Sequence, residues 1–208
     1  MKLVIGLLSC AQHQDRDDLC RRTWIPKATV LGIDVVFLRG GGSGKTIRNG
    51  DILLLPTPTS YESLPQRTRA FCQWLLTTDA TAAFKADNDT YLVPERLLAF
   101  EHWDEDYFGN EPGGRFRGWA SGGGGYGLSK TAIQIVAERM TGRHGAEDKM
   151  VSKTLSAHDI KPFFAEPRRF VAWGIDAPDR RPTADNAIIS THQISFDLWM
   201  KIHQEIYG

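Results

Sequence analysis

Residues 82–92 read Ala-Ala-Phe-Lys-Ala-Asp-Asn-Asp-Thr-Tyr-Leu, a short apolar segment that runs directly into a pair of acids. The pattern predicts a strand over Ala82–Lys85, with Asp87 and Asp89 at its carboxyl end. In α/β proteins, ligands bind at the carboxyl ends of the strands. Two carboxylates separated by one residue can share a divalent metal, and their hard oxygens suit Mg²⁺ or Mn²⁺. Taken alone, the segment favours the alternative of an Asx-rich turn with solvated acids.

Strand and helix patterns alternate on both sides of this segment. Apolar runs predict buried strands over Leu3–Ser9 and Ile33–Leu38, a short third strand over Ile52–Leu55 and a late strand over Ile188–Ile194, and Arg117–Ser121 is predicted as a strand edge. Amphipathic stretches and their start signals predict helices over Arg16–Trp24, Glu62–Thr78, Pro94–Phe100, Thr131–Met140 and Glu147–Ala157, and a last helix to Tyr207. The alternation predicts an α/β fold with a mostly parallel central sheet flanked by helices. No internal repeat or linker interrupts it, so we expect a single domain over residues 1–208.

Composition narrows the classes of partner. The 208 residues carry 25 Lys plus Arg and 25 Asp plus Glu, so the net charge is zero. No overall field attracts nucleic acid or an anionic membrane, and no apolar run reaches the roughly 20 residues of a membrane span. The cysteines Cys10, Cys20 and Cys72 are odd in number and lack short spacings, which argues against a disulfide framework or structural zinc. We expect each to be a small buried hydrophobic residue.

Two glycine-rich segments imitate nucleotide-binding motifs. Gly40–Thr46 resembles a P-loop, but Arg39 stands where the motif needs its first glycine and no helix start follows. A flexible hairpin or connector is the favoured interpretation. Gly122, Gly124 and Gly127 have the spacing of a dinucleotide fingerprint, but a lone match so late in the chain is weak. This segment predicts only that backbone approaches something closely, in a structural turn or a ligand loop.

Residues 84–92 closely resemble the metal-binding segment of glycosyltransferase family 31, particularly core 1 β1,3-galactosyltransferases and fringe-like enzymes. Further blocks of that family follow in its order along the chain. They are Arg16 with Arg21–Trp24, the glycine-rich Ser121–Lys130, the acidic pair Glu147–Asp148, and Ile188–His192 with Trp199–Met200 after it. Five blocks in order, spanning nearly the whole chain, are much more specific than any one of them.

The resemblance implies a GT-A fold, the nucleotide-diphospho-sugar transferase fold, with a UDP-sugar donor and a divalent metal, usually Mn²⁺ with Mg²⁺ as the alternative. It implies inverting transfer of a hexose, such as galactose or N-acetylglucosamine, to an acceptor hydroxyl, commonly in a β1,3 linkage. The acceptor would be a glycan, a glycopeptide or another hydroxyl compound. The competing hypotheses are a catalytically degenerate protein of the same fold that binds a nucleotide-sugar or glycan, and a metal-dependent nucleotide-sugar hydrolase.

Carried over by position, the resemblance assigns the metal to Asp89, Asp87 and His192, with Asp89 the principal ligand. It assigns the catalytic base to Asp148, with Glu147 as the fallback. Inversion requires such a base to take the acceptor proton. Both acids are expected to open a helix, whose dipole keeps a carboxylate ionised.

Donor binding is expected of basic, polar and glycine positions in the same blocks. They are Arg16, Arg21, Lys85, Asp87, Asn88, Gly123 and Gly124. The two arginines could pair with diphosphate oxygens or be solvated helix residues, and Lys85 could simply balance the acids beside it. Asn88 stands where relatives often carry a third aspartate, so we expect this position to affect donor-sugar preference rather than metal binding.

The expected compartment follows from the cysteines and the chain as written. An odd cysteine count fits a reducing environment better than the oxidising Golgi. We therefore expect a cytoplasmic location. The soluble catalytic domain of a Golgi-type or membrane-associated enzyme is the alternative.

Overall fold

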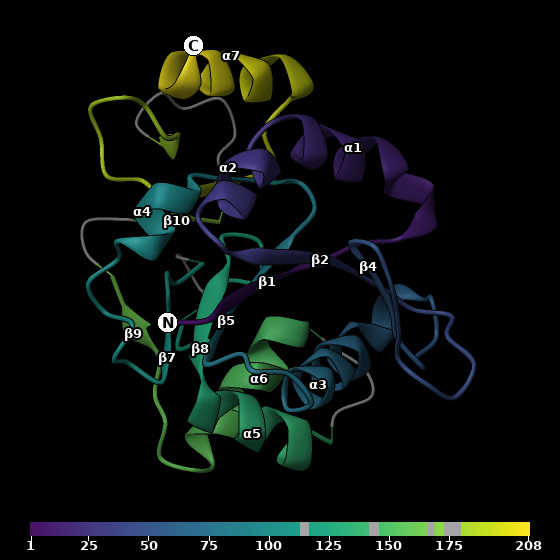
Figure 1. Ribbon diagram of the computed structural model, residues 1–208. Helices are drawn as coiled ribbons and strands as arrows, with labels where there is room; N and C mark the ends of the chain where they lie inside the picture. Colours follow the sequence, from purple (N-terminus) through teal and green to yellow (C-terminus); the bar gives the residue numbers. More distant parts are fainter. Residues whose placement is uncertain (113–116, 142–145, 166–168, 173–179) are drawn as a thin grey trace.

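The computed structural model describes residues 1–112, 117–141, 146–165, 169–172 and 180–208 (Figure 1). The strands are β1 (Leu3–Leu8), β2 (Asp34–Arg39), β3 (Ile47–Asn49), β4 (Ile52–Leu54), β5 (Ala82–Asp87), β6 (Thr90–Leu92), β7 (Tyr107–Gly109), β8 (Tyr126–Ser129), β9 (Phe163–Phe164), β10 (Phe170–Val171) and β11 (Ser190–His192). The helices are α1 (Gln14–Arg22), α2 (Ile25–Val30), α3 (Leu64–Leu75), α4 (Pro94–Leu98), α5 (Lys130–Arg139), α6 (Glu147–Ser156) and α7 (Phe196–Tyr207), with short 3₁₀ helices at Ala11–His13 and Tyr61–Ser63.

The central sheet has the strand order β3-β4-β2-β1-β5-β8-β7-β9, and a smaller sheet has the order β10-β11-β6. Strands β4, β2, β1 and β5 run parallel to one another, whereas β3 pairs antiparallel with β4 and β8 pairs antiparallel with β5. In this register Leu8 lies opposite both Leu38 and Asp87. The carboxyl ends of three strands therefore meet at one edge. The mixed α/β fold with a mostly parallel central sheet confirms the prediction.

Helices cover both faces of the sheet, with α3, α5 and α6 on one face and α1, α2 and α7 on the other (Figure 1). Strand β1 shows why helices must cover both faces of the sheet. Leu3, Ile5 and Leu7 belong to the core under α1, α2 and α7, whereas Val4 and Leu8 belong to the core under α3, α5 and α6. Burying each such side chain contributes about 1.5–3 kcal/mol, so a continuously apolar strand is stable only between two helical layers.

Several predicted boundaries differ from the structure. The helix predicted over Arg16–Trp24 ends at Arg22, and a separate helix, α2, begins at Ile25 with Pro26 in its first turn, where its missing N–H costs nothing. The strand predicted over Arg117–Ser121 is wrong, and β8 begins at Tyr126 instead. The strands β3, β6, β7, β9 and β10 were not predicted. Each has only two or three residues, too few for a hydrophobic period to be visible.

Packing and pairing within the protein account for parts of both glycine-rich segments. After Gly40–Thr46 the chain enters the β3–β4 hairpin rather than a helix, in agreement with the favoured hairpin interpretation. Gly127 lies inside β8, where a Cβ would stand 2.0 Å from the ring of Phe108.

Cys20 and Cys72 are buried as expected, but Cys10 is half-buried; all three are free thiols. Within the described ranges, no helix combines the length and apolar character required to cross a bilayer.

Candidate active site

An acidic cluster with one histidine forms where the two sheets approach each other. Asp87 ends β5, Asp89 lies in the turn to β6, and His192 ends β11. Antiparallel pairing of β11 with β6 places His192 opposite Thr90, directly beside the acidic turn. One ligand atom from each of the three residues lies within 4.8 Å of the others. Two carboxylates and an imidazole fit Mn²⁺, which accepts both oxygen and nitrogen ligands.

The imidazole of His192 is held in one orientation. Its Nδ1 lies 2.8 Å from the carbonyl oxygen of Ala172, so Nδ1 carries the proton and donates it to that carbonyl. The other nitrogen, Nε2, then faces Asp89 Oδ1 at 3.0 Å and Asp87 Oδ2 at 3.7 Å. Burial lowers the pKa of His192, but the hydrogen bond and charge of Asp89, with Asp87, raise it overall.

The glycine-rich stretch packs directly on this cluster. A Cβ on Gly123 would lie 2.4 Å from His192 Nδ1, and the Gly123 carbonyl accepts a hydrogen bond from Thr90 Oγ1 at 2.8 Å. Gly122 and Gly123 line the cavity described below, whereas a Cβ on Gly124 would stand 3.1 Å from the backbone nitrogen of Ala172. Close approach is thus explained by contacts within the protein. A donor contact with Gly123 or Gly124 stays a prediction.

Lys85 links the cluster to the acidic pair that opens α6. Its side chain is 2% exposed, and Nζ lies 2.9 Å from Asp87 Oδ1 and 3.0 Å from Glu147 Oε2. Burial lowers the pKa of Lys85, but the charges of Asp87 and Glu147 outweigh it and raise the pKa overall. The ammonium is therefore charged and fully paired. In this structure Lys85 balances the acids, which is one of the two roles expected for it.

Glu147 and Asp148 open α6 as predicted but have different surroundings. Glu147 is buried and accepts hydrogen bonds from Thr68 Oγ1 at 2.7 Å and from the Tyr126 hydroxyl, in addition to its ion pair with Lys85. Burial raises the pKa of Glu147. Its oxygens are occupied by neighbours, so the geometry favours a structural role for Glu147.

Asp148 is half-buried and lines the cavity. Its Oδ2 accepts the backbone N–H of Gly122 at 3.0 Å, and its Oδ1 accepts the N–H of Lys149 at 2.7 Å. These two bonds fix the carboxylate at the amino end of α6, and each oxygen has a further lone pair that is free to accept a hydrogen bond. Of the acidic pair, Asp148 has the environment that a proton acceptor needs.

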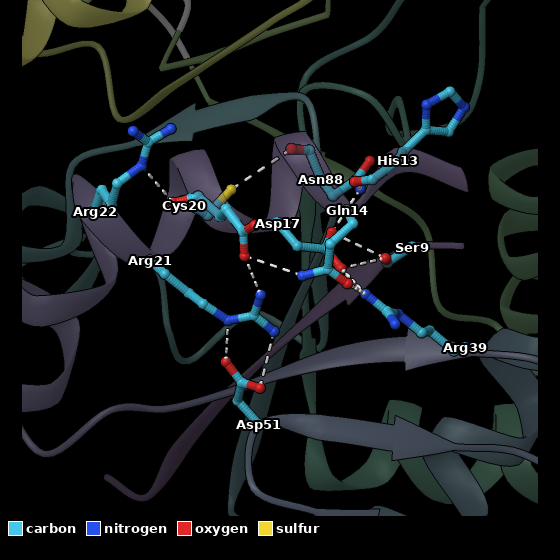
Figure 2. A network of polar contacts seen from close by, with 11 residues as sticks. Ser9, His13, Gln14, Asp17, Cys20, Arg21, Arg22, Arg39, Asp51 and Asn88 are labelled. Atoms are coloured by element: carbon cyan, nitrogen blue, oxygen red, sulfur yellow. Dashed lines mark hydrogen bonds and ion pairs between the residues drawn. The ribbon is translucent and has the colours of Figure 1, made fainter. Parts of the chain in front are cut away.

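The two predicted arginines have separate positions. Arg16 Nη1 lies 2.9 Å from Asp89 Oδ2, so it reaches the cluster. Arg21 instead holds Asp51, with Nε at 2.7 Å (Figure 2). Its Nη1 also lies 2.7 Å from Asp18. It lines a neighbouring cavity that Arg16 and Asp89 border. The structure thus brings Arg16, but not Arg21, to the acidic cluster.

Asn88 is held in place by a hydrogen bond to a buried acid, Asp17, which was not among the predicted site residues. Its Nδ2 donates to Asp17 Oδ1 at 2.7 Å, and Asp17 is fully buried on α1 (Figure 2). Asp17 also accepts hydrogen bonds from Ser9, at the end of β1, and Arg39, at the end of β2. The amide of Asn88 therefore anchors the acidic turn to three elements. The available signal was a charged residue three positions before Cys20, on the buried face of α1.

The pairing with Asp17 predicts the effect of placing an aspartate at position 88. The variant Asn88→Asp places two carboxylates in hydrogen-bond contact in a buried site, and we expect it to lower the free energy of unfolding by about 2 kcal/mol or more. Adding Asp17→Asn exchanges amide and carboxylate and should recover most of that loss. Urea denaturation of both single variants and the double variant measures the coupling. Strictly additive effects would contradict a direct Asp17–Asn88 interaction.

Most of the predicted site residues line one cavity of about 570 Å³, whereas Arg21 and Gly124 do not; the lining ones are Arg16, Lys85, Asp87, Asn88, Asp89, Gly123, Glu147, Asp148 and His192. The cavity lining includes the metal-ligand candidates, Gly122 and Asp148, together with the segments Ser9–Cys10, Gln12–His13 and Thr59–Tyr61. The volume is in the range of small-molecule sites, and the cavity opens at the carboxyl ends of the parallel strands.

Comparison with known proteins supports the fold. No protein-family model matches the sequence, and no curated protein is significantly similar to it. A solved structure of a glycosyltransferase involved in the glycosylation of the major capsid of PBCV-1 is similar over 99% of this chain and 98% of its own, with a TM-score of 0.58 and 8% sequence identity. The chain shares a glycosyltransferase fold. The narrower resemblance to family 31 stays a prediction.

Proposed function

We propose that residues 1–208 form one catalytic domain of a metal-dependent, inverting glycosyltransferase. It transfers a hexose from a UDP-sugar to the hydroxyl of a glycan, glycopeptide or similar acceptor, with a β1,3 linkage as the expected product. The observation that carries the proposal is the placement of Asp87, Asp89 and His192 in one cavity with Asp148. The glycosyltransferase fold of the PBCV-1 protein supports it.

The residues of the cavity divide the chemistry between them. Asp89, Asp87 and His192 would hold the divalent metal, which supplies charge neutralisation for the diphosphate leaving group when bound. Asp148 would take the proton of the acceptor hydroxyl as that oxygen bonds to the sugar carbon and the bond from this carbon to UDP breaks. The diphosphate leaves with the bonding electron pair. Lys85, which is paired with Glu147, would hold Asp87 in position, and neither Lys85 nor Glu147 would contact the reacting atoms.

Calorimetric titration of UDP with and without Mn²⁺ tests the donor site. We expect Mn²⁺ to raise UDP affinity by about tenfold or more and Asp89→Ala to abolish that gain, because one carboxylate ligand is lost. Asp104→Ala, which removes an exposed acid in a distant turn, is the matched control and should behave as wild type. UDP release that requires an acceptor would then separate a transferase from a binding protein or a hydrolase. A UDP affinity that is the same with and without Mn²⁺ would refute the metal-dependent donor site.

A further inference from the structure

A buried arginine lies in the wall of this cavity and was not among the predicted site residues. Arg67 is 3% exposed on α3, lines the cavity and contacts Ser9, which lines it as well. It stands three residues after Leu64 and four before Phe71, on the apolar stripe of its helix. A charged residue on a buried helix face is rarely found without a partner of opposite charge.

The polar contacts of Arg67 are all to neutral oxygens. Nη1 donates to the carbonyl of Ser9 at 3.2 Å, and Nη2 donates to the carbonyl of Pro58 at 3.2 Å and to Ser63 Oγ at 3.5 Å. Nε is buried without a hydrogen-bond partner among the described residues. Burial lowers the pKa of the guanidinium, yet an arginine remains protonated in proteins. A positive charge is thus buried without a carboxylate beside it in the described part of the chain.

The other strong cations of the cavity are already neutralised. Arg16 is paired with Asp89, and Lys85 is paired with Asp87 and Glu147. Among the described arginines and lysines that line this cavity, Arg67 alone lacks an ion pair. Burying a charge without a counter-ion is costly, so the fold retains at this position a group that an anionic ligand would satisfy.

The position of Arg67 relates it to the acidic cluster. The Ser9 carbonyl that it contacts follows Leu8, which lies opposite Asp87 in the parallel register. The guanidinium and the acidic cluster therefore reach the same edge of the sheet. Since a guanidinium binds phosphate oxygens through parallel N–H donors, a diphosphate matches both groups better than a neutral base or sugar does.

We propose that Arg67 binds an anionic oxygen of the diphosphate of the donor nucleotide. This inference rests on the proposed function, and it names a residue that selects for the charged part of the donor. It also explains why the position carries an arginine although an apolar residue would complete the helix stripe. The ligand supplies the counter-charge that the folded chain does not.

Calorimetry on Arg67→Gln, Arg67→Lys and Arg69→Gln tests the proposal, with UDP, inorganic pyrophosphate and uridine as probes in the presence of Mn²⁺. Arg69→Gln is the matched control, because Arg69 lies on the same helix and its Nε donates to the Ala137 carbonyl, away from the cavity. We expect Arg67→Gln to weaken UDP and pyrophosphate by about tenfold to a hundredfold and to leave uridine unchanged. Arg67→Lys keeps the charge without the fork and should show a smaller loss.

The outcomes separate this inference from the proposed function. Unchanged UDP and pyrophosphate affinity in Arg67→Gln would overturn the role of Arg67 while leaving the donor site intact. An equal loss of uridine affinity would also overturn it, because the contact would then be to the nucleoside. Pyrophosphate binding that depends on Arg67 in a protein that ignores UDP would support the anion site and refute the UDP-sugar donor. Thermal unfolding shows whether Arg67→Gln is folded, and Arg67→Lys gives the same comparison if it is not.

Discussion

Replacing Asp148 with asparagine is expected to lower hexose transfer by about a hundredfold to ten-thousandfold, the usual contribution of a general base. Asparagine has the same shape, and its side-chain oxygen can still accept the N–H of Gly122, which now lies 3.0 Å from the carboxylate. It cannot take a proton from the acceptor. The measurement is acceptor-dependent UDP release, with UDP affinity determined in parallel by calorimetry.

UDP affinity should remain close to wild type in Asp148→Asn, because a base acts on the acceptor rather than on the nucleotide. Asp159→Asn provides a matched control, since Asp159 is exposed just beyond the carboxyl end of α6 and has a left-handed backbone that asparagine also adopts. It should retain full activity. Near-normal turnover in Asp148→Asn would show that another group accepts the proton.

The second large effect is on stability. Lys85→Met should lower the free energy of unfolding by about 3–5 kcal/mol, because it leaves the buried Glu147 carboxylate without its cation. Thr68 and Tyr126 would still donate to Glu147, but neutral donors do not replace the charge of an ammonium 3.0 Å away. Urea denaturation at neutral pH measures the loss. Lys153→Met, which removes an exposed lysine on α6, should have little effect.

A double variant tests whether the charge pair is the cause. Adding Glu147→Gln to Lys85→Met removes both buried charges, and the double variant should regain a large part of the lost stability. If the loss of unfolding free energy in the double variant equals the sum of the losses in the two single variants, the aliphatic stem of Lys85 rather than its charge would be the stabilising feature. Unchanged stability in Lys85→Met alone would contradict the buried ion pair.

Local patterns predicted the longer elements and missed most of the short strands. The strands near Leu3–Leu8 and Asp34–Arg39 and the helices near Lys130–Arg139 and Glu147–Ser156 follow from apolar periodicity and start signals. Strands of two or three residues, such as β6 and β10, have no readable period. They form because a neighbouring strand offers backbone partners, which is a property of the assembled sheet.

The candidate site divides in the same way. The residue types at Asp87, Asp89 and His192 were identifiable as metal ligands from the sequence and its resemblance, and the structure brings their ligand atoms together. Sequence reasoning left Glu147 as an alternative base and gave Arg21 a donor role. The structure surrounds Glu147 with donors and pairs Arg21 with Asp51. Such assignments depend on partners far along the chain.

By itself the sequence determined the α/β class, the position of the acidic turn after a buried strand and the helix that presents Asp148, because each follows from residues close together in the chain. Only the tertiary structure decided which charges are satisfied. Asp17 meets Asn88 across 71 positions, and Thr68 meets Glu147 across 79. Whether a buried charge has a counter-ion depends on the side chains that pack against it. Those neighbours are brought together only when the two helical layers pack on the sheet.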